Sequence, residues 1–253
     1  MLTRIIGPGR AGTSLHRALT AAGWDVDGPH GRGQDPSARA GAADGVDLLV
    51  IATRDAEVAA VAGSVRPRAG TTVAHLSGLL GLDALAPHRH RAAVHPLVSL
   101  PDADVGALRL GGGAWFGLRA NAPRAEAAAR AVVTALGGRS FSVPEEDRAR
   151  YHAAAAIAAN HLVAVLAQAE RVGASAGVPP EALLTLARGA LENVDRLGPH
   201  LALTGPVARG DWETVAAHLD ALDEGDRPAY RALAAEAARL AGVEPPPGLL
   251  DPR

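Results

Sequence analysis

The chain contains no lysine and no cysteine, so its 25 Lys+Arg residues are all arginine. Codon usage in a GC-rich genome explains this bias, but the bias still has chemical consequences. A Schiff-base lysine, a P-loop lysine, a cysteine nucleophile, a disulfide and a cysteine-bound metal are all excluded. Any catalysis therefore depends on His, Tyr, Ser, Thr, Asn, Asp, Glu or Arg side chains, on the backbone, or on a cofactor.

Excess charge of one sign is also missing, since the formal net charge is −2 over 253 residues. Without a basic surface, nucleic acid is not an expected partner. No apolar run reaches the roughly 18 residues of a membrane span, and the N-terminus lacks the layout of a signal peptide. We therefore expect a soluble, cytoplasmic protein with no membrane partner.

The first part of the chain alternates short apolar runs with alanine-rich stretches. The predicted strands are 2–6, 24–28, 47–52, 71–76, 92–95, 114–118 and 140–143. The predicted helices between them are 13–22, 56–65 and 123–136. This alternation predicts an α/β domain over residues 1–144, with a doubly wound, Rossmann-type parallel sheet that binds a dinucleotide.

After Pro144 the strand patterns stop. The sequence predicts a long helix over 145–176, ended by Gly177 and Pro179, and further helices over 181–197, 211–222 and 227–241. Residues 145–253 are therefore predicted to form a smaller all-α domain.

A glycine-rich turn joins the first predicted strand to the first helix, with the sequence Gly7-Pro8-Gly9-Arg10-Ala11-Gly12. In the pattern G-x-G-x-x-G, the first glycine makes the turn and the second lets the backbone approach a pyrophosphate. The third lets the helix pack closely on the strand. The position of the turn favours a dinucleotide site, and the alternative is a tight turn without a ligand.

The residues at the end of the second predicted strand indicate whether the site prefers NADP or NAD. NAD sites usually place an acidic residue at this tip to bind the ribose hydroxyls. Here Asp27 comes before the tip, whereas His30 and Arg32 follow it. Arg32, assisted by Arg10, suits the 2′-phosphate of NADP. We therefore expect NADP rather than NAD, although both arginines could instead be solvated surface residues.

Polar residues also follow two later strands at the edge where open α/β sheets bind ligands. Ala52 and Thr53 follow the third predicted strand, and Ser77 follows the fourth. The backbone of Ala52 and Thr53 is expected to contact the nicotinamide ribose. Helix capping is the alternative role for Thr53 and Ser77.

The order of several motifs resembles a known family. The motifs are the glycine loop, His75–Gly78 (HLSG), His95–Ser99 (HPLVS), Tyr151–His152 followed by alanines, Asn160, and Thr204–Asp211 (TGPVARGD). They resemble a bacterial family of Rossmann-like oxidoreductases with a helical C-terminal domain of unknown function. More distantly, the layout is similar to 6-phosphogluconate and hydroxyisobutyrate dehydrogenases and to pyrroline-carboxylate and ketopantoate reductases. The resemblance implies NAD(P)-linked hydride transfer, a site between the domains and a homodimer formed through the helical part.

The absence of lysine is a difference from the dehydrogenases and reductases that this layout resembles. The hydroxyacid dehydrogenases and ketopantoate reductase use a lysine on the first long helix of the second domain. In the hydroxyacid dehydrogenases an asparagine lies one turn later. If Asn160 takes the asparagine place, the residue one turn earlier is Ala156. Either another group protonates the carbonyl oxygen, or the substrate is an imine, or the protein no longer catalyses a reduction.

Histidines are the strongest remaining candidates for proton transfer, because imidazole titrates near neutral pH. His152 and Asn160 are eight residues apart, which places them on much the same face of an α-helix. We predict His152 as general acid and Asn160 as a substrate-orienting residue, with an interdomain structural role as the alternative. His95 and Ser99 are predicted to contact the site from the end of a strand.

Two residues of the loop before the third C-terminal helix complete the candidate site. Arg209 could bind a substrate carboxylate through two hydrogen bonds, and Thr204 lies in the same turn. The alternative is a structural turn in which Asp211 caps the following helix. The histidines show no convincing metal spacing, so no metal is expected. Tyr151 is either a second proton donor or an interface aromatic.

We therefore predict an NADP-dependent oxidoreductase that transfers a hydride between nicotinamide and a small carbonyl or imino acid, with a ketopantoate-like substrate as one candidate. Two alternatives stay open: a non-catalytic NADP-binding sensor or scaffold, and a deazaflavin-linked NADP oxidoreductase.

Overall fold

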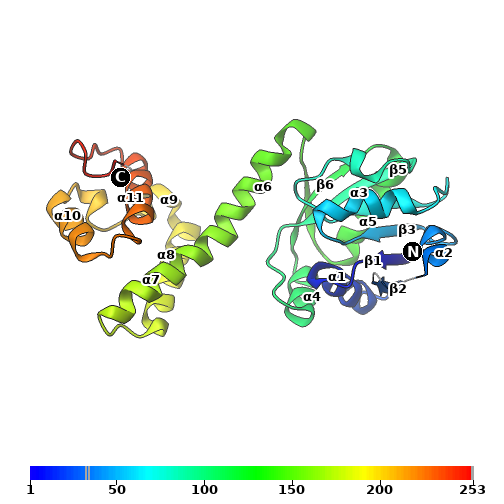
Figure 1. Cartoon of the computed structure of the whole chain (residues 1–253), viewed down its shortest axis with the longest axis horizontal. Coiled ribbons are helices and arrows are strands. Elements are labelled where there is room, and N and C mark those ends of the chain that lie inside the picture. The colour runs from blue at the N-terminus through cyan, green and yellow to red at the C-terminus, as the bar shows by residue number, and fades with distance from the viewer. Residues whose placement is uncertain (32, 34, 252–253) are drawn as a thin grey trace. The chain divides into compact units, whose positions relative to one another are not determined.

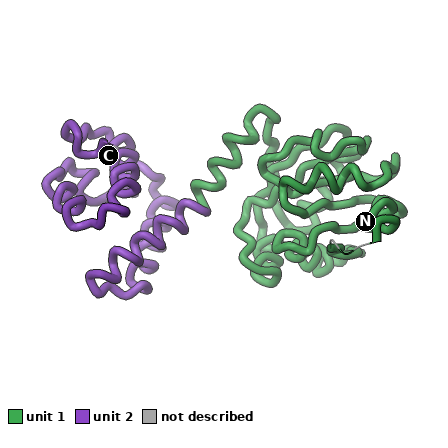
Figure 2. Tube along the Cα trace, viewed as in Figure 1, with its two compact units in different colours: residues 1–159 green, residues 160–253 purple. Residues whose placement is uncertain are grey.

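The computed structural model describes residues 1–31, 33 and 35–251. It divides into two compact units, Met1–Ala159 and Asn160–Arg253 (Figure 2). Each unit is described by itself below.

The first unit is built on one sheet of seven strands (Figure 1). They are β1 (Leu2–Ile6), β2 (Asp25–His30), β3 (Leu48–Ile51), β4 (Thr72–His75), β5 (His90–Pro96), β6 (Trp115–Ala120) and β7 (Arg139–Ser142). Their order is β2-β1-β3-β4-β5-β6-β7, and all neighbours run parallel except β5 and β6. The predicted Rossmann-type fold is confirmed, with one antiparallel pair that the sequence pattern did not predict.

Helices cover both faces of this sheet. The helices and 3₁₀ turns of the unit are α1 (Arg10–Ala21), α2 (Pro36–Ala40), α3 (Asp55–Ser64), η1 (Leu82–Leu85), α4 (Ala103–Gly111), α5 (Pro123–Ala135), η2 (Glu145–Asp147) and α6 (Arg148–Ala156). One apolar core joins the sheet to α1 and α5, and a second joins it to α3 and η1. Because both faces are covered, β3 and β4 are buried along their whole length.

Helix α4 lies between the two antiparallel strands in the sequence and was not predicted. It packs on α1, where Gly106 lies so close to Ser14 that a Cβ on Gly106 would overlap the serine hydroxyl. The hydroxyl of Ser14 also donates to the backbone oxygen of Asp102, the N-cap of α4. The start of α4 is therefore held to α1, and after α4 the chain re-enters the sheet as β6, antiparallel to β5.

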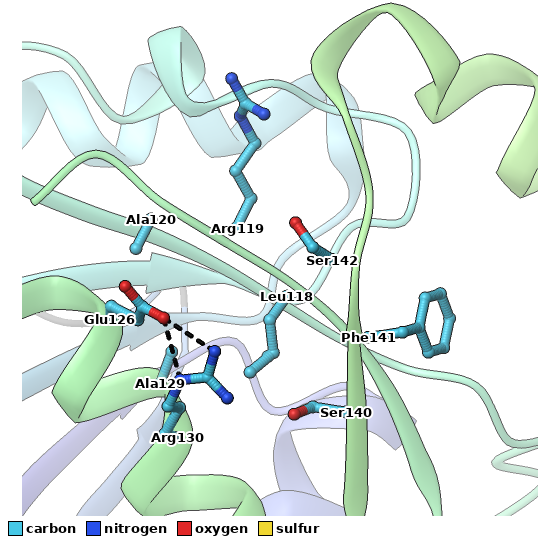
Figure 3. Close-up of a pocket in the computed structure, with 9 residues that line it drawn as sticks. All are labelled: Leu118, Arg119, Ala120, Glu126, Ala129, Arg130, Ser140, Phe141 and Ser142. Carbon is cyan, nitrogen blue, oxygen red and sulfur yellow. Dashed lines mark hydrogen bonds and ion pairs between the residues drawn. The ribbon is translucent and has the colours of Figure 1, made fainter. Parts of the chain in front are cut away.

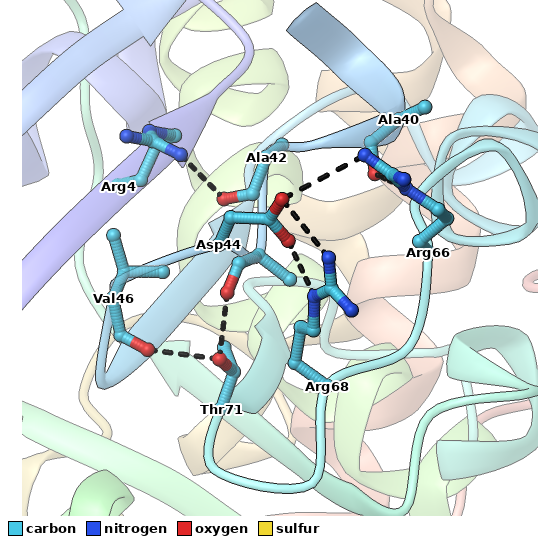
Figure 4. Close-up of polar contacts among 9 residues, drawn as sticks. Arg4, Ala40, Ala42, Asp44, Val46, Arg66, Arg68 and Thr71 are labelled. Atoms are coloured by element: carbon cyan, nitrogen blue, oxygen red, sulfur yellow. Dashed lines mark hydrogen bonds and ion pairs between the residues drawn. The ribbon is translucent and has the colours of Figure 1, made fainter. Parts of the chain in front are cut away.

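A polar network ties the loop before β3 to the loop before β4 (Figure 4). The carboxylate of Asp44 accepts from Arg68 Nε at 2.5 Å and lies 3.7 Å from Arg66. The buried hydroxyl of Thr71 lies 2.8 Å from the backbone oxygens of both Ala43 and Val46. These loops precede the two strands, so the network stabilises the sheet at the edge opposite the carboxyl ends.

The second unit is helical. Its elements are α7 (Leu162–Ser175), α8 (Pro180–Leu197), α9 (Pro199–Ala202), the 3₁₀ turn η4 (Val207–Arg209), α10 (Trp212–Ala221) and α11 (Arg227–Ala241), and its core is formed by Val207, Val215, Ala234, Ala238 and Leu250. The π-helical turn η3 (Ile157–His161) joins α6 to α7 and contains the division between the units. The last described strand ends at Ser142, next to the predicted domain boundary at residue 144. That boundary stays a prediction.

One helical segment in the described ranges, Glu145–Ser175, is long and apolar enough to cross a membrane by length and composition alone. Its most apolar window has a mean hydropathy of 1.3, and no part of that window is buried. No such segment was predicted from the sequence, because polar residues interrupt every apolar run before it reaches the length of a membrane span. The average hydropathy of a window can still be high when it includes a few polar residues. A single helix of this kind is weak evidence for a membrane span, and core helices of soluble proteins pass the same test.

Candidate functional site

The glycine loop after β1 has the geometry that its motif predicts. Gly7 has a φ of +114°, and a Cβ there would lie 2.5 Å from the backbone oxygen of Ala52. A Cβ on Gly12 would overlap the carbonyl oxygen of Gly7. By contrast, a Cβ on Gly9 would meet nothing within 4 Å. Gly7 and Gly12 are therefore required by packing, whereas the space beside Gly9 is open to a ligand.

The start of α1 has unpaired donors facing this loop. Gly9 is the N-cap, no side chain caps the helix, and its first turn contains no acidic residue. The first N–H groups of a helix have no intrahelical partner and carry a partial positive charge. Arg10 opens the helix, and Pro8 and Ala11 complete the loop. These features fit the pyrophosphate of a dinucleotide.

Among the described residues at the end of β2, the carboxylate of Asp27 is already paired with basic groups. Asp27 Oδ2 accepts from Arg4 Nε at 2.6 Å, and Asp27 Oδ1 lies 3.0 Å from His30 Nε2. Burial opposes the ionisation of Asp27, but the hydrogen bond from Arg4 and the charge of His30 outweigh it and lower its pKa. The predicted phosphate ligand Arg32 lies outside the described residues. Arg39 of α2, which the sequence analysis did not select, donates Nη2 to the backbone oxygen of Gly31 at 3.0 Å.

Thr53 and Ser77 differ in their free hydrogen-bonding capacity. Thr53 Oγ1 is buried and has no partner among the described residues. Ser77 Oγ donates to Asp55 Oδ2 at 2.7 Å and accepts from the N–H groups of Leu79 and Leu80 at 3.1 and 2.9 Å. The Ser77 hydroxyl is thus fully used within the protein, whereas the buried Thr53 hydroxyl is left without a partner among the described residues.

A cluster of aromatic side chains lies at the ends of β4 and β5. His95 Nδ1 lies 2.5 Å from the hydroxyl of Tyr151, and the ring centroids of His95 and His152 are 6.3 Å apart. Both imidazoles contact Gly78. A Cβ there would lie 2.8 Å from His152 Cδ2 and 2.9 Å from His95 Cε1. The structure therefore brings His95, Tyr151 and His152, all three considered in the sequence analysis, together in one unit.

The sheet register explains this convergence. Ile51 pairs with His75, and His75 pairs with Ala93, so the carboxyl ends of β3, β4 and β5 lie along one edge. Ligands of open α/β sheets bind at this edge. The glycine loop follows β1, which pairs with β3 in the same direction. The glycine loop and the aromatic cluster thus occupy the same edge of the sheet.

Burial sets the protonation of the cluster. Desolvation, followed by the charges of His152 and Arg148, lowers the pKa of His95 to about 4. Desolvation and then Arg148 likewise lower the pKa of His75 to about 4. Burial raises the pKa of the Tyr151 phenol. At neutral pH, His95 and His75 are therefore neutral imidazoles and Tyr151 is protonated.

Among the described residues of the first unit, Ser99 makes no hydrogen bond or ring contact with this cluster. Ser99 is exposed, and its backbone oxygen accepts from Arg109 at 2.8 Å. Asn160 is exposed in the π-helical turn, which alters the α-helical spacing used to align it with His152. Thr204 and Arg209 are exposed residues of the second unit. The proposed roles of these four residues stay predictions.

Asp211 caps α10, because its carboxylate accepts from the N–H of Thr214 at 3.2 Å and from its hydroxyl at 2.8 Å. Within the described ranges, no group of three or more His, Asp or Glu side chains could hold a metal ion.

Arg148 is a buried residue of the site that the sequence did not reveal. Its side chain donates Nη2 to the backbone oxygen of Ser77 at 2.9 Å, and the residue is 4% exposed. Arg150 lies two positions later in the same arginine-rich stretch, and 85% of its side chain is exposed. No pattern of residue types distinguishes the two. Only the fold shows that Arg148 faces the sheet.

A shallow depression lies elsewhere, between β6, β7 and α5 (Figure 3). Its cations are already paired: Arg130 Nη2 lies 2.8 Å from Glu126, and Arg119 Nε lies 3.1 Å from Glu145. Both serines that line it, Ser140 and Ser142, come from β7. None of its lining residues belongs to the glycine loop, and Phe141 packs edge to face on Tyr151 of the aromatic cluster, with ring centroids 5.6 Å apart.

Comparisons with known proteins agree with this architecture. Residues 114–237 match a family described as a domain of unknown function, DUF2520. No curated protein matches the chain. A candidate NADP oxidoreductase from Bacteroides fragilis has a similar structure, with a TM-score of 0.77 and 19% identity, over 94% of this chain and 97% of that protein.

Two further solved structures are similar over nearly their whole length. A Thermotoga maritima protein gives a TM-score of 0.72 at 22% identity, over 95% of this chain and 98% of that one. Pyrroline carboxylate reductase from Plasmodium falciparum, with NADP bound, gives 0.62 at 13% identity, again over 95% and 98%. At these identities the likeness establishes the fold. Residues 114–237 thus match the DUF2520 family, and the chain has a Rossmann-type fold with a helical C-terminal region, which confirms the predicted resemblance.

Proposed function

We propose that this protein is an NADP-dependent oxidoreductase that transfers a hydride between nicotinamide and a small carbonyl or imino acid. The observation that carries the proposal is the shared sheet edge. A loop fitted to a dinucleotide pyrophosphate and a cluster of His95, Tyr151 and His152 lie at the carboxyl ends of adjacent parallel strands.

The glycine loop and the residues after β2 would hold the cofactor. The open space at Gly9 and the N-terminus of α1 would receive the pyrophosphate, and the orphan hydroxyl of Thr53 would bind near the nicotinamide ribose. Arg39, held at Gly31, and Arg32 would provide cations for a 2′-phosphate. Asp27 is already engaged by Arg4 and His30, so it is a poor acceptor for ribose hydroxyls. This distribution of charge supports NADP over NAD.

When bound, NADPH supplies the hydride that reduces the carbon of a C=O or C=N bond. The protein must then supply one proton to the oxygen or nitrogen of that bond. His152 is exposed and can exchange protons with water, which suits a general acid. With the Tyr151 hydroxyl donating to Nδ1, the neutral His95 keeps its hydrogen on Nε2 and can donate a hydrogen bond to the same substrate atom.

This assignment needs no lysine. Pyrroline carboxylate reductase, whose fold this chain shares, is named for a cyclic imine, which supports the imino acid as a substrate class. A ketopantoate-like oxo acid remains a second candidate within the same reaction type. Asn160, Ser99, Thr204 and Arg209 are the residues we propose to orient the substrate.

We also propose that the protein is a cytoplasmic homodimer formed through its helical unit. Large apolar side chains of this unit are exposed, among them Val163 (66%), Leu186 (71%) and Leu201 (75%). Helix α8 has no buried residue and is amphipathic, with charged residues such as Arg188 and Glu192 between its leucines. An amphipathic helix of this kind fits a second protein copy better than the interior of a bilayer. Light scattering should give twice the monomer mass, and Leu186→Glu should reduce that mass toward the monomer.

Two measurements test the enzymatic proposal. Isothermal calorimetry should show tighter binding of NADPH than of NADH, and Arg39→Ala should weaken NADPH binding while leaving NADH binding unchanged. NADPH consumption with a panel of 2-oxo acids and cyclic imino acids should then identify turnover. Binding of NADPH without consumption across the panel would instead favour a sensor or scaffold. Turnover only with a deazaflavin would favour a deazaflavin-linked NADP oxidoreductase.

A further inference from the structure

The guanidinium of Arg148 binds the backbone on both sides of Gly78. Its Nη2 donates to the oxygen of Ser77 at 2.9 Å, and its Nε donates to the oxygen of Leu79 at 3.3 Å. The residue is only 4% exposed, so the geometry is enclosed by protein. Because the two accepting carbonyls flank a single glycine, the guanidinium fixes the position of Gly78.

Gly78 is the residue against which the two catalytic candidates pack. Its missing side chain would meet His152 Cδ2 at 2.8 Å, His95 Cε1 at 2.9 Å and His95 Nε2 at 3.0 Å. Arg148 and His152 both belong to α6, whereas His95 belongs to β5. The arginine therefore connects the helix that carries one imidazole to the segment that contacts both.

The remaining contacts of this segment come from other elements. The Ser77 hydroxyl donates to Asp55 of α3, and a Cβ on Gly81 would overlap the carboxylate of Glu145. The segment is thus enclosed by α3 and η2, and Arg148 supplies the hydrogen bonds from α6. Removal of the guanidinium would leave one buried and one partly buried backbone oxygen without these donors.

The charge of Arg148 is also unusual for a buried residue. Among the described residues, no carboxylate lies within ion-pair distance of it, and its nearest acidic neighbours act only through the longer-range charges of Glu145 and Asp55. A buried charge without a close partner costs stability. The charge instead acts on the neighbouring titratable groups over a longer range.

The groups that surround His95 show how this charge acts. They are His152, Arg148 and Tyr151 of α6, Asp55 of α3 and His75 of β4. After desolvation, the positive charges of His152 and Arg148 lower the pKa of His95, and Asp55 acts in the opposite direction. Arg148 thus favours the neutral form of the imidazole that its own backbone contacts help to place.

We propose that Arg148 is a positioning residue of the hydride-transfer site, which holds the Ser77–Leu79 segment so that His95 and His152 converge on Gly78. The inference rests on the proposed function only in treating these imidazoles as the catalytic groups. Arg148 itself is assigned no contact with substrate or cofactor.

The test uses the full-length protein without cofactor or substrate. Selectively labelled histidine allows the His95 imidazole to be titrated by NMR in the wild type, Arg148→Met and Arg148→Lys. The matched control is Arg150→Met, because Arg150 lies on the same helix with 85% of its side chain exposed. Methionine keeps the length of the buried side chain and removes both its charge and its donors.

We expect Arg148→Met to raise the titration midpoint of His95 by about half a pH unit or more, because a neighbouring positive charge is removed. The imidazole resonances of His152 should move as well, and Arg150→Met should leave both rings unchanged. A folded Arg148→Met protein whose His95 and His152 titrate as in the wild type would overturn the proposal.

If Arg148→Met does not fold, Arg148→Lys decides the question. Lysine keeps the charge but cannot donate to both carbonyls in the planar geometry of a guanidinium. We expect the His95 and His152 resonances to shift, and unshifted resonances would contradict the proposal. In a turnover assay the lysine variant should lower kcat and leave the KM for NADPH unchanged. Absence of turnover in the wild type would count against the proposed function and would leave the NMR result standing.

Discussion

The hydroxyl of Tyr151 lies 2.5 Å from Nδ1 of His95 and joins α6 to the end of β5. The two rings meet edge to face with centroids 5.4 Å apart. Gly117 of β6 provides the space for this contact, since a Cβ there would lie 2.9 Å from the tyrosine hydroxyl. The orientation of the His95 imidazole therefore depends on Tyr151.

Tyr151→Phe should lower kcat about fivefold, because the lost hydrogen bond contributes roughly 1 kcal/mol and no longer fixes the tautomer of His95. NADPH affinity should not change. Steady-state kinetics and calorimetry measure the two effects. Tyr230→Phe is the matched control, because the Tyr230 hydroxyl lies 2.7 Å from His218 Nδ1 in the same edge-to-face geometry within the helical unit. An equal loss of activity in both variants would contradict the role of Tyr151.

Gly9→Ala and Gly12→Ala should have different effects. A Cβ on Gly9 meets no protein atom within 4 Å, so Gly9→Ala should fold with nearly wild-type stability and bind NADPH at least tenfold more weakly. Gly12→Ala should lose stability as well, because its Cβ overlaps the Gly7 carbonyl. Thermal unfolding and calorimetry separate the two outcomes. Unchanged NADPH affinity in Gly9→Ala would show that the loop is only a tight turn.

Gly78→Ala should separate the two imidazoles. The added methyl would lie within 3.0 Å of atoms in both His95 and His152, and overpacking of this kind typically costs about 1–3 kcal/mol. We expect lower stability in urea unfolding and a larger loss of kcat than of NADPH binding. Gly63→Ala is the control, because a Cβ on that helical residue meets nothing within 4 Å. Wild-type kcat in Gly78→Ala would argue against a catalytic role for the pair.

Stability should fall as the pH decreases from about 6.5 toward 4. The folded-state pKa values of His75 and His95 are lowered to about 4, so between these limits the unfolded chain binds more protons than the folded chain at these two sites. Their contribution is complete above pH 6.5 and is lost as pH approaches 4. Urea unfolding at several pH values measures the slope, which should be shallower in His95→Gln. An unchanged slope in that variant would show that His95 is not held neutral by the fold.

Much of the fold could be predicted from the sequence, because strand β1, the glycine loop and the apolar run of β3 are local patterns. Helix α11 was also predicted with its observed ends, Arg227 and Ala241. The antiparallel direction of β6 could not be predicted, because the apolar pattern of a strand does not give its direction and the preceding helix α4 was not predicted.

The site was predictable where residue type and position coincide. His95 and His152 were selected because imidazoles stand at a strand end and on a helix, and the fold brings them together at Gly78. Arg148 was not selected, since its burial depends on tertiary structure alone. The hydrogen bonds of the Ser77 hydroxyl to Asp55 and to two backbone N–H groups could not be predicted either, because Asp55 belongs to a different element, α3.

Direct transfer of hydrogen from the cofactor tests the central claim most directly. NADPH deuterated at C4 of the nicotinamide is incubated with the protein and each member of the panel of 2-oxo acids and cyclic imino acids, and the products are analysed by mass spectrometry. We expect one deuterium in the reduced carbon of at least one product, with transfer strongly slowed in His152→Ala. Saturating NADPH binding with no deuterium in any product would contradict the proposed hydride transfer.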